Sequence, residues 1–202
     1  MKLVHEEILI KTGIFSRSSE WRKIHEDICS SIKAVDWPLG SGAFSLYPES
    51  GKLRGKGNGV KPIKNRFIEN LEKKGWRPEL ALNFQDSVPI GRMDAVKTLD
   101  HSHFVVEWET GNISSSHRSL NKMALGLLKG RLVGGALIVP SRSLYYYLTD
   151  RIGNFNELLP YVDLWKSIKC RNGVLTIFVV EHDNLDKSVS RIPKGTSGRA
   201  LG

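Results

Sequence analysis

The chain has 202 residues, of which 40% are hydrophobic and 25% are charged, so it is long enough to bury a core without disulfides or structural zinc. Lysine and arginine outnumber aspartate and glutamate by 30 to 21, and the resulting formal net charge of +9 favours a polyanionic partner such as nucleic acid. No apolar run reaches the roughly 18 residues of a membrane span, and no secretory signal pattern is present, so we expect a cytoplasmic protein without a membrane partner.

The spacing of apolar residues predicts strands alternating with helices, and therefore an α/β fold. A first strand is expected at Leu3–Ile10, although the pair Glu6 and Glu7 leaves a helix open there. Ser19 is in position to cap a helix that runs to about Ala34. Further along the chain we expect helices at Pro62–Lys74, Ile113–Leu128, Ser143–Asp150 and Phe155–Trp165, and strands at Leu80–Phe84, Arg92–Leu99, His103–Glu109, Ala136–Val139 and Val174–Glu181.

The pattern of the chain changes near its C-terminal end. Lys187–Gly202 contains four basic residues and no acidic ones, which is typical of a flexible basic tail. We therefore expect a single domain over residues 1–186, followed by a flexible tail over residues 187–202.

The clearest chemical pattern is a set of acidic residues on two consecutive apolar strands. Asp94 lies on the first, and Glu107 and Glu109 lie on the second. Because side chains alternate along a strand, Glu107 and Glu109 point to one face, about 6–7 Å apart, and Trp108 points to the other. Two glutamates at this spacing usually mark a solvated strand face, but here the strand is otherwise apolar and aromatic. Three carboxylates at one end of two strands suit a hard divalent cation.

A glycine-rich segment before the second helix has the composition of a phosphate-binding surface. Six basic residues and no acidic ones occur from Gly51 to Arg66, and glycines allow the backbone to approach a phosphate closely. A solvated mobile loop is the alternative. Our candidates for contacts with the DNA backbone are Lys52, Arg54 and Lys56.

Polar residues suited to reading base edges follow two of the predicted strands. The first group begins the helix after the acidic strand, where free backbone N–H groups also favour phosphates; the alternative role of its serines is helix capping. The second group follows the strand Ala136–Val139. The candidate DNA-binding residues are Asn112, Ser114, Ser115, Ser116, His117 and Arg118 in the first group and Ser141, Arg142 and Ser143 in the second.

The ordered set of Asp94, Glu107 and Glu109 resembles the PD-(D/E)xK nuclease motif, in a variant that has glutamate in place of the terminal lysine. This variant is the hallmark of the BamHI group of type II restriction endonucleases, which includes BglII and BstYI. The segments Ser45–Pro48, Ile63–Trp76 and Ser141–Tyr146 also resemble that group, so the resemblance spans roughly residues 45–150.

The resemblance implies a restriction-endonuclease-like nuclease domain, in which a mixed central β-sheet is flanked by helices. It implies a homodimer that cleaves double-stranded DNA at a short palindromic site with Mg²⁺, or alternatively Mn²⁺, leaving 5′-phosphate and 3′-hydroxyl ends. A different PD-(D/E)xK nuclease and a non-catalytic DNA-binding module are the alternatives. The candidate dimer contacts are the helix Ile113–Leu128 and the helix that contains Tyr145–Tyr147.

The resemblance also assigns roles to the acidic residues. Asp94, Glu107 and the backbone carbonyl of Trp108 would bind the metal ion. Glu109 would bind a second ion or act as a base on water. Glu79 is the candidate for a fourth acidic catalytic residue, and Asp86 is an equally near alternative.

Overall fold

The computed structural model describes all residues of the chain except 54, 83–90, 101, 110, 150–151 and 195–202. Its centre is a six-stranded mixed sheet with the strand order β1-β7-β6-β5-β4-β3. The strands β5, β6 and β7 are parallel to one another, and the remaining neighbours are antiparallel. The strands are β1 (Lys2–Thr12), β3 (Arg77–Leu82), β4 (Gly91–Thr98), β5 (His103–Trp108), β6 (Leu132–Pro140) and β7 (Gly173–Glu181).

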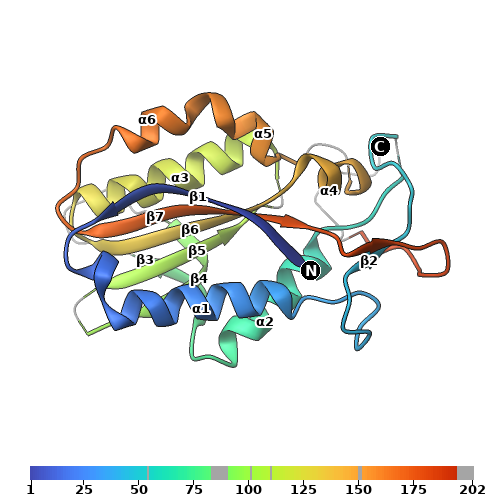
Figure 1. Cartoon of the computed structure of the whole chain (residues 1–202), viewed down its shortest axis with the longest axis horizontal. Coiled ribbons are helices and arrows are strands. Elements are labelled where there is room, and N and C mark those ends of the chain that lie inside the picture. Colours follow the sequence, from blue (N-terminus) through green and yellow to red (C-terminus); the bar gives the residue numbers. More distant parts are fainter. Residues whose placement is uncertain (54, 83–90, 101, 110, 150–151, 195–202) are drawn as a thin grey trace.

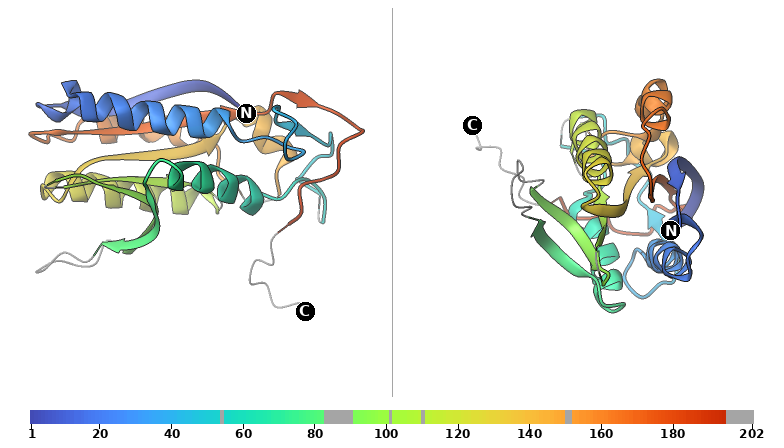
Figure 2. Two further views of the ribbon diagram at one scale, coloured as in Figure 1. Left: turned by 90° about the horizontal axis from the view of Figure 1, so that it is seen from below. Right: turned by 90° about the vertical axis from the view of Figure 1, so that its left-hand side faces the viewer.

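Helices cover both faces of the sheet, which confirms the predicted fold class (Figures 1 and 2). One face carries α1 (Ser19–Lys33) and α2 (Lys61–Glu72); the other carries α3 (Ile113–Leu128), α5 (Phe155–Leu158), η2 (Leu159–Tyr161) and α6 (Val162–Lys166). Beyond one end of the sheet lie α4 (Arg142–Tyr147) and a small parallel sheet of β2 (Ser45–Leu46) and β8 (Asn184–Leu185), and η1 (Phe15–Arg17) precedes α1. Among the described residues, no helix is both long and apolar enough to cross a membrane.

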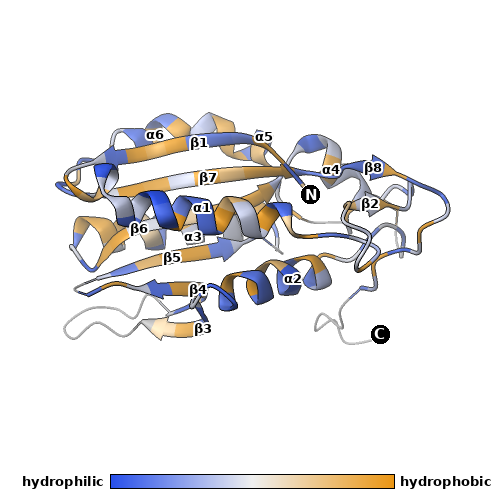
Figure 3. Cartoon of the chain, turned by 60° about the horizontal axis from the view of Figure 1, so that its bottom comes forward, coloured by the Kyte–Doolittle hydropathy of each residue, from blue (hydrophilic) through white to orange (hydrophobic). Residues whose placement is uncertain are grey.

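The core consists of two apolar clusters, one on each face of the sheet. Consecutive residues of the central strands alternate between them: Phe178 belongs to the cluster beneath α1 and α2, and Ile177 to the cluster beneath α3 and α6. Because both faces are buried, β6 and β7 are apolar at almost every position (Figure 3).

The prediction of β6 was too short because the sequence shows two glycines in its interior. Gly134 and Gly135 lie within the nine-residue strand Leu132–Pro140, whereas we expected only Ala136–Val139. A Cβ atom at Gly134 would lie 2.2 Å from Cε2 of Phe104. The glycines therefore leave room for large side chains that pack against the strand, and they do not interrupt it.

Three helix predictions also need correction, two of them at one end of the helix and one because the helix is divided. The N-cap of α1 is Ser18, whose side chain accepts a hydrogen bond from the N–H of Trp21 at 3.1 Å, and not Ser19. The helix expected to reach Asp150 ends at Tyr147, where the backbone of the next residue becomes extended. The single helix expected over Phe155–Trp165 is instead divided into α5, η2 and α6, with a proline at the start of η2.

The first described part of the expected flexible tail, residues 187–194, packs against the rest of the protein. Ile192 is 1% exposed, and its N–H donates a hydrogen bond to Oδ1 of Asn58 at 3.1 Å. Arg191 forms an ion pair with Glu49 at 2.6 Å. These contacts hold the segment beside the glycine-rich basic loop, and residues 195–202 lie outside the described part of the chain.

We predict that Gly134→Ala lowers the free energy of unfolding by about 1–3 kcal/mol, because the added methyl group collides with the Phe104 ring. Urea denaturation of the variant and the unchanged protein measures the loss. The matched background is Phe104→Leu: adding Gly134→Ala to it should cost less than adding it to the unchanged protein. An equal cost in both backgrounds would show that this contact is not the reason for the glycine.

Candidate active site

The carboxylates of Asp94 and Glu107 lie where the ladder of backbone hydrogen bonds between β4 and β5 ends. The described ladder between these strands runs from Thr98 and His103 to Ala95 and Val106. Beyond it, the N–H of Trp108 donates a hydrogen bond to Oδ2 of Asp94 at 2.8 Å, so a side chain replaces the backbone partner. A pocket of about 210 Å³ opens here, lined by Lys64, Asp94, Glu107, Trp108, Glu109, Gly111, Ser115, Arg118, Ser119, Lys122 and Leu137.

Glu107 has a strongly perturbed carboxyl group. Burial raises the pKa of its carboxyl to about 7, and the negative charge of Asp94 adds to the effect. Two nearby ammonium groups, those of Lys122 and Lys64, oppose it. A pair of carboxylates that cannot both ionise at low cost is a strong site for a cation, because a bound cation removes their repulsion.

Glu109 lies in the same pocket but is held by the start of α3. Its side chain accepts hydrogen bonds from the N–H of Gly111 and from the hydroxyl of Ser116, one on each oxygen. Residue 109 is 5% exposed. Within the described residues, no group of three or more His, Cys, Asp and Glu side chains is close enough to hold a metal ion. Asp94 and Glu107 are two carboxyl groups of this pocket that interact with each other.

Two lysines that the sequence analysis did not assign to the site approach these carboxylates from opposite faces of the sheet. Lys64 on α2 forms a short hydrogen-bonded ion pair with Oδ1 of Asp94. Lys122 on α3 lies 3.5 Å from Oε1 of Glu107. The sequence contains a signal for Lys122, because Ser115, Arg118 and Ser119 precede it at the spacing of one helix face. No comparable pattern distinguishes Lys64 from the other lysines of its segment.

Glu79, the candidate fourth acidic residue, is not brought into the pocket. Its side chain is 72% exposed and lies 3.7 Å from Arg92. Its backbone has a positive φ of 47°, which is uncommon for a residue other than glycine. Glu79 belongs to β3, the strand next to Asp94 in the sheet. Asp86, the alternative, lies outside the described residues.

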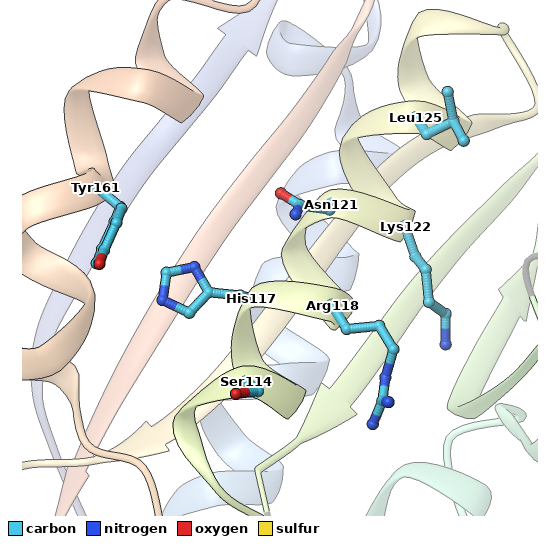
Figure 4. Close-up of a pocket in the computed structure, with 7 residues that line it drawn as sticks. All are labelled: Ser114, His117, Arg118, Asn121, Lys122, Leu125 and Tyr161. Atoms are coloured by element: carbon cyan, nitrogen blue, oxygen red, sulfur yellow. The ribbon is translucent and has the colours of Figure 1, made fainter.

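The candidate DNA-binding residues at the start of α3 are divided among three environments. Ser115 lines the acidic pocket, Ser114 and His117 line a second pocket of about 650 Å³ beside Tyr161, and Arg118 lines both. Figure 4 shows His117 directed toward Tyr161, while Arg118 and Lys122 extend away from it. Two candidates have structural roles: Asn112 caps α3, and Ser116 is fully buried against Glu109.

The second group of candidates meets the glycine-rich loop at α4. Nζ of Lys52 lies 3.2 Å from the centre of the Tyr145 ring, and the guanidinium carbon of Arg142 lies 4.9 Å from it. Ser143 and Arg142 are exposed. Ser141 caps α4 by accepting a hydrogen bond from the N–H of Leu144 at 3.0 Å. Two candidate surfaces far apart in the sequence thus form one basic patch.

Of the two remaining candidates in the glycine-rich loop, the structure describes only one. Lys56 is exposed and lies 3.5 Å from Glu49, while Arg54 is outside the described residues. Gly51 donates a hydrogen bond from its N–H to the carbonyl of Tyr146 at 2.8 Å, which fixes the loop against α4.

The mixed sheet and its acidic pocket between parted strands define the class of restriction-endonuclease-like α/β proteins. The family described as restriction endonuclease BamHI matches residues 1–199, so the chain belongs to this family of type II restriction endonucleases. The predicted enzyme class is thereby confirmed.

Named relatives resemble the chain over nearly its whole length. The type II restriction enzyme OkrAI of Oceanobacter kriegii is 45% identical over 201 residues, covering 100% of both chains. The type II restriction enzyme BamHI of Bacillus amyloliquefaciens is 33% identical over 201 residues, covering 96% of this chain and 87% of its own length. A crystal structure of restriction endonuclease BglII complexed with a DNA 16-mer has a TM-score of 0.47 and 12% identity, covering 65% of each chain.

We predict that Glu107→Gln stabilises the metal-free protein more at pH 8 than at pH 5. The carboxyl of Glu107 has a pKa of about 7 in the folded protein against an ordinary value of 4.5, so the folded state binds its proton more tightly than the unfolded chain does. Its ionisation therefore lowers stability progressively as the pH rises from about 4.5 through 7, by up to about 3 kcal/mol. Urea denaturation in a chelating buffer measures the difference, and a pH-independent difference would contradict the assignment.

Proposed function

We propose that this protein is a Mg²⁺-dependent type II restriction endonuclease that cleaves double-stranded DNA at a short palindromic site, leaving 5′-phosphate and 3′-hydroxyl ends. The observation that carries the proposal is the pair of Asp94 and Glu107 between parted strands, in a basic protein of the BamHI family. We further propose that it acts in the cytoplasm, where the DNA of a bacterial cell lies.

The donor set fits a hard divalent cation such as Mg²⁺, with Mn²⁺ as the alternative. Asp94 and Glu107 supply carboxylate oxygens, and in our proposal the backbone carbonyl of Trp108 completes the protein ligands. The pairing of Asp94 with an ammonium group supports the fit, since that position already attracts a cation. A bound divalent ion would lower the pKa of a coordinated water and offset negative charge on the phosphate. Glu109 would bind a second ion or accept a proton from water.

In the proposed reaction, an oxygen of water bonds to phosphorus and the bond from phosphorus to O3′ breaks. The released O3′ takes up a proton, and the phosphate remains on the 5′ end. The chain's own part is to hold the phosphodiester against the carboxylates, which are negative themselves. Arg118 and Lys122 line the pocket and supply positive charge for this purpose.

Sequence recognition is assigned to the exposed polar groups around the pocket. Arg142 is exposed and lies over the Tyr145 ring, so its guanidinium is available for a base contact, while the ammonium group of Lys52 is buried against the same ring. Ser115 and Arg118, which line the acidic pocket at the start of α3, form the second recognition surface in our proposal. Ser116 is left out of it, because its side chain is buried.

A palindromic site calls for a two-fold symmetric protein, and we propose a homodimer on this ground. The supporting surface is the outer side of α3, η2 and α6, where large apolar side chains are exposed. Leu125 is 44% exposed, Tyr161 46% and Leu164 62%. Leu125 and Tyr161 line the larger pocket, where polar side chains surround them: Ser114, His117, Arg118, Asn121 and Lys122. Such a patch is typical of an interface between proteins.

We predict that the purified protein cuts phage DNA into discrete bands with Mg²⁺, and that Asp94→Asn lowers the rate at least on the order of 100-fold. Agarose gels over a time course measure both. Asp100→Asn, on an exposed turn, is the control that makes the same change in charge. Smeared products would favour a nuclease without sequence preference, and retarded but uncut DNA would favour a binding module.

We predict that Leu125→Glu converts the dimer into a monomer, because a charge would be buried in the apolar interface. Light scattering coupled to size-exclusion chromatography should give about twice 22.7 kDa for the unchanged protein and about that mass for the variant. Leu39→Glu, which changes a more exposed leucine elsewhere, is the control and should remain dimeric. A monomeric unchanged protein at micromolar concentration would refute the proposed interface.

A further inference from the structure

The ion pair between Lys64 and Asp94 occupies the atom that a divalent cation would need. Nζ of Lys64 donates to Oδ1 of Asp94, while Oδ2 of the same carboxylate accepts the N–H of Trp108. The side chains of Lys64 and Asp94 are 23% and 13% exposed, so solvent screens the pair only in part. Both oxygens of Asp94 are therefore engaged before any metal ion arrives.

The ion pair is not needed to attach α2 to the sheet. Phe67 of α2 packs against Trp108 with a distance of 4.9 Å between ring centres. Ile63 and Leu71 of the same helix are also buried. Because these apolar contacts already hold α2 against the sheet, the ion pair of Lys64 adds little to the stability of that packing. Its effect falls instead on the charge of the pocket.

The pocket already holds positive charge beside its carboxyl groups without a metal ion. Lys64 pairs with Asp94, Lys122 lies beside Glu107, and Arg118 and Glu109 also line the pocket, so three cationic groups accompany three carboxyl groups. A divalent cation added to this set would face these positive charges as well as its ligands. Binding of the ion to Asp94 is favourable only if the ammonium group of Lys64 leaves and finds another anion.

From this arrangement, and on the basis of the function proposed above, we infer that Lys64 is a positioning residue that exchanges Asp94 for a phosphate of the DNA when the metal ion binds. Without DNA, its ammonium group competes with the ion for Asp94 and keeps metal affinity low. A phosphodiester in the pocket gives that group a new partner and releases Asp94 to the ion. Metal and DNA then increase each other's affinity, as thermodynamic linkage requires.

This inference deepens the proposed function by making metal binding depend on the substrate. An endonuclease of this kind holds its metal ion firmly only when a phosphate is present to accept the lysine. Lys64 reaches the pocket from α2, on the opposite face of the sheet from α3.

The test is the affinity of the full-length protein for Mn²⁺ in the absence of DNA, measured from the electron paramagnetic resonance signal of the free ion. We expect Lys64→Met to bind Mn²⁺ about 5- to 30-fold more tightly than the unchanged protein, in the usual range of coupling between sites. The control is Lys61→Met, which removes the same charge from an exposed position on the same helix and should change the affinity less than about twofold. Lys64→Gln serves the same purpose should the methionine variant not fold.

A second measurement adds a 16-base-pair duplex without palindromic segments, so that binding is observed without site-specific cleavage. The duplex should raise the Mn²⁺ affinity of the unchanged protein and of Lys61→Met by a larger factor than that of Lys64→Met. Equal Mn²⁺ affinities of Lys64→Met and the unchanged protein, with Asp94→Asn weakened, would overturn the role of Lys64 alone. Mn²⁺ binding unaffected by Asp94→Asn would overturn the proposed metal site as well.

Discussion

The hydrogen bond from the N–H of Trp108 to Asp94 is the interaction on which the site depends. It lies just past the last described pair of the ladder between β4 and β5, and it brings the carboxylate to the place of a backbone acceptor. The indole of Trp108 meanwhile packs against Phe67 and so fixes α2. One residue thereby sets the distance between the strands, the orientation of Asp94 and the helix that carries Lys64.

The acidic pair could be predicted because its signal is local. Strand periodicity places Glu107 at the end of an apolar strand. Asp94 lies on the preceding strand, which is its antiparallel neighbour in the sheet. The main helices were predicted for the same reason, since capping residues and apolar spacing lie within a few turns. The order of the elements and the alternation of apolar residues are sufficient to predict a contact between residues that are close in sequence.

The rest of the site depends on contacts between distant segments, which single-sequence patterns do not contain. Lys64 meets Asp94 across 30 residues, and Lys52 meets Tyr145 only because the loop is packed against α4. Glu109 lies in the same pocket as Glu107, but hydrogen bonds from Gly111 and Ser116 at the start of α3 hold its carboxylate, and strand alternation alone does not reveal them. The segment at residues 187–194 resembles a tail in composition, but buried Ile192 and the ion pair of Arg191 with Glu49 hold it against segments far away in the sequence.

Helix α3 presents different chemistry on its two exposed sides. Arg118 and Lys122 extend on one side, and His117 faces Tyr161 on the other (Figure 4). Arg118 and Lys122 line both the acidic pocket and the larger pocket beside Tyr161, so a group that fills either pocket meets the same two cations of α3. Occupation of one pocket therefore changes the charge available in the other.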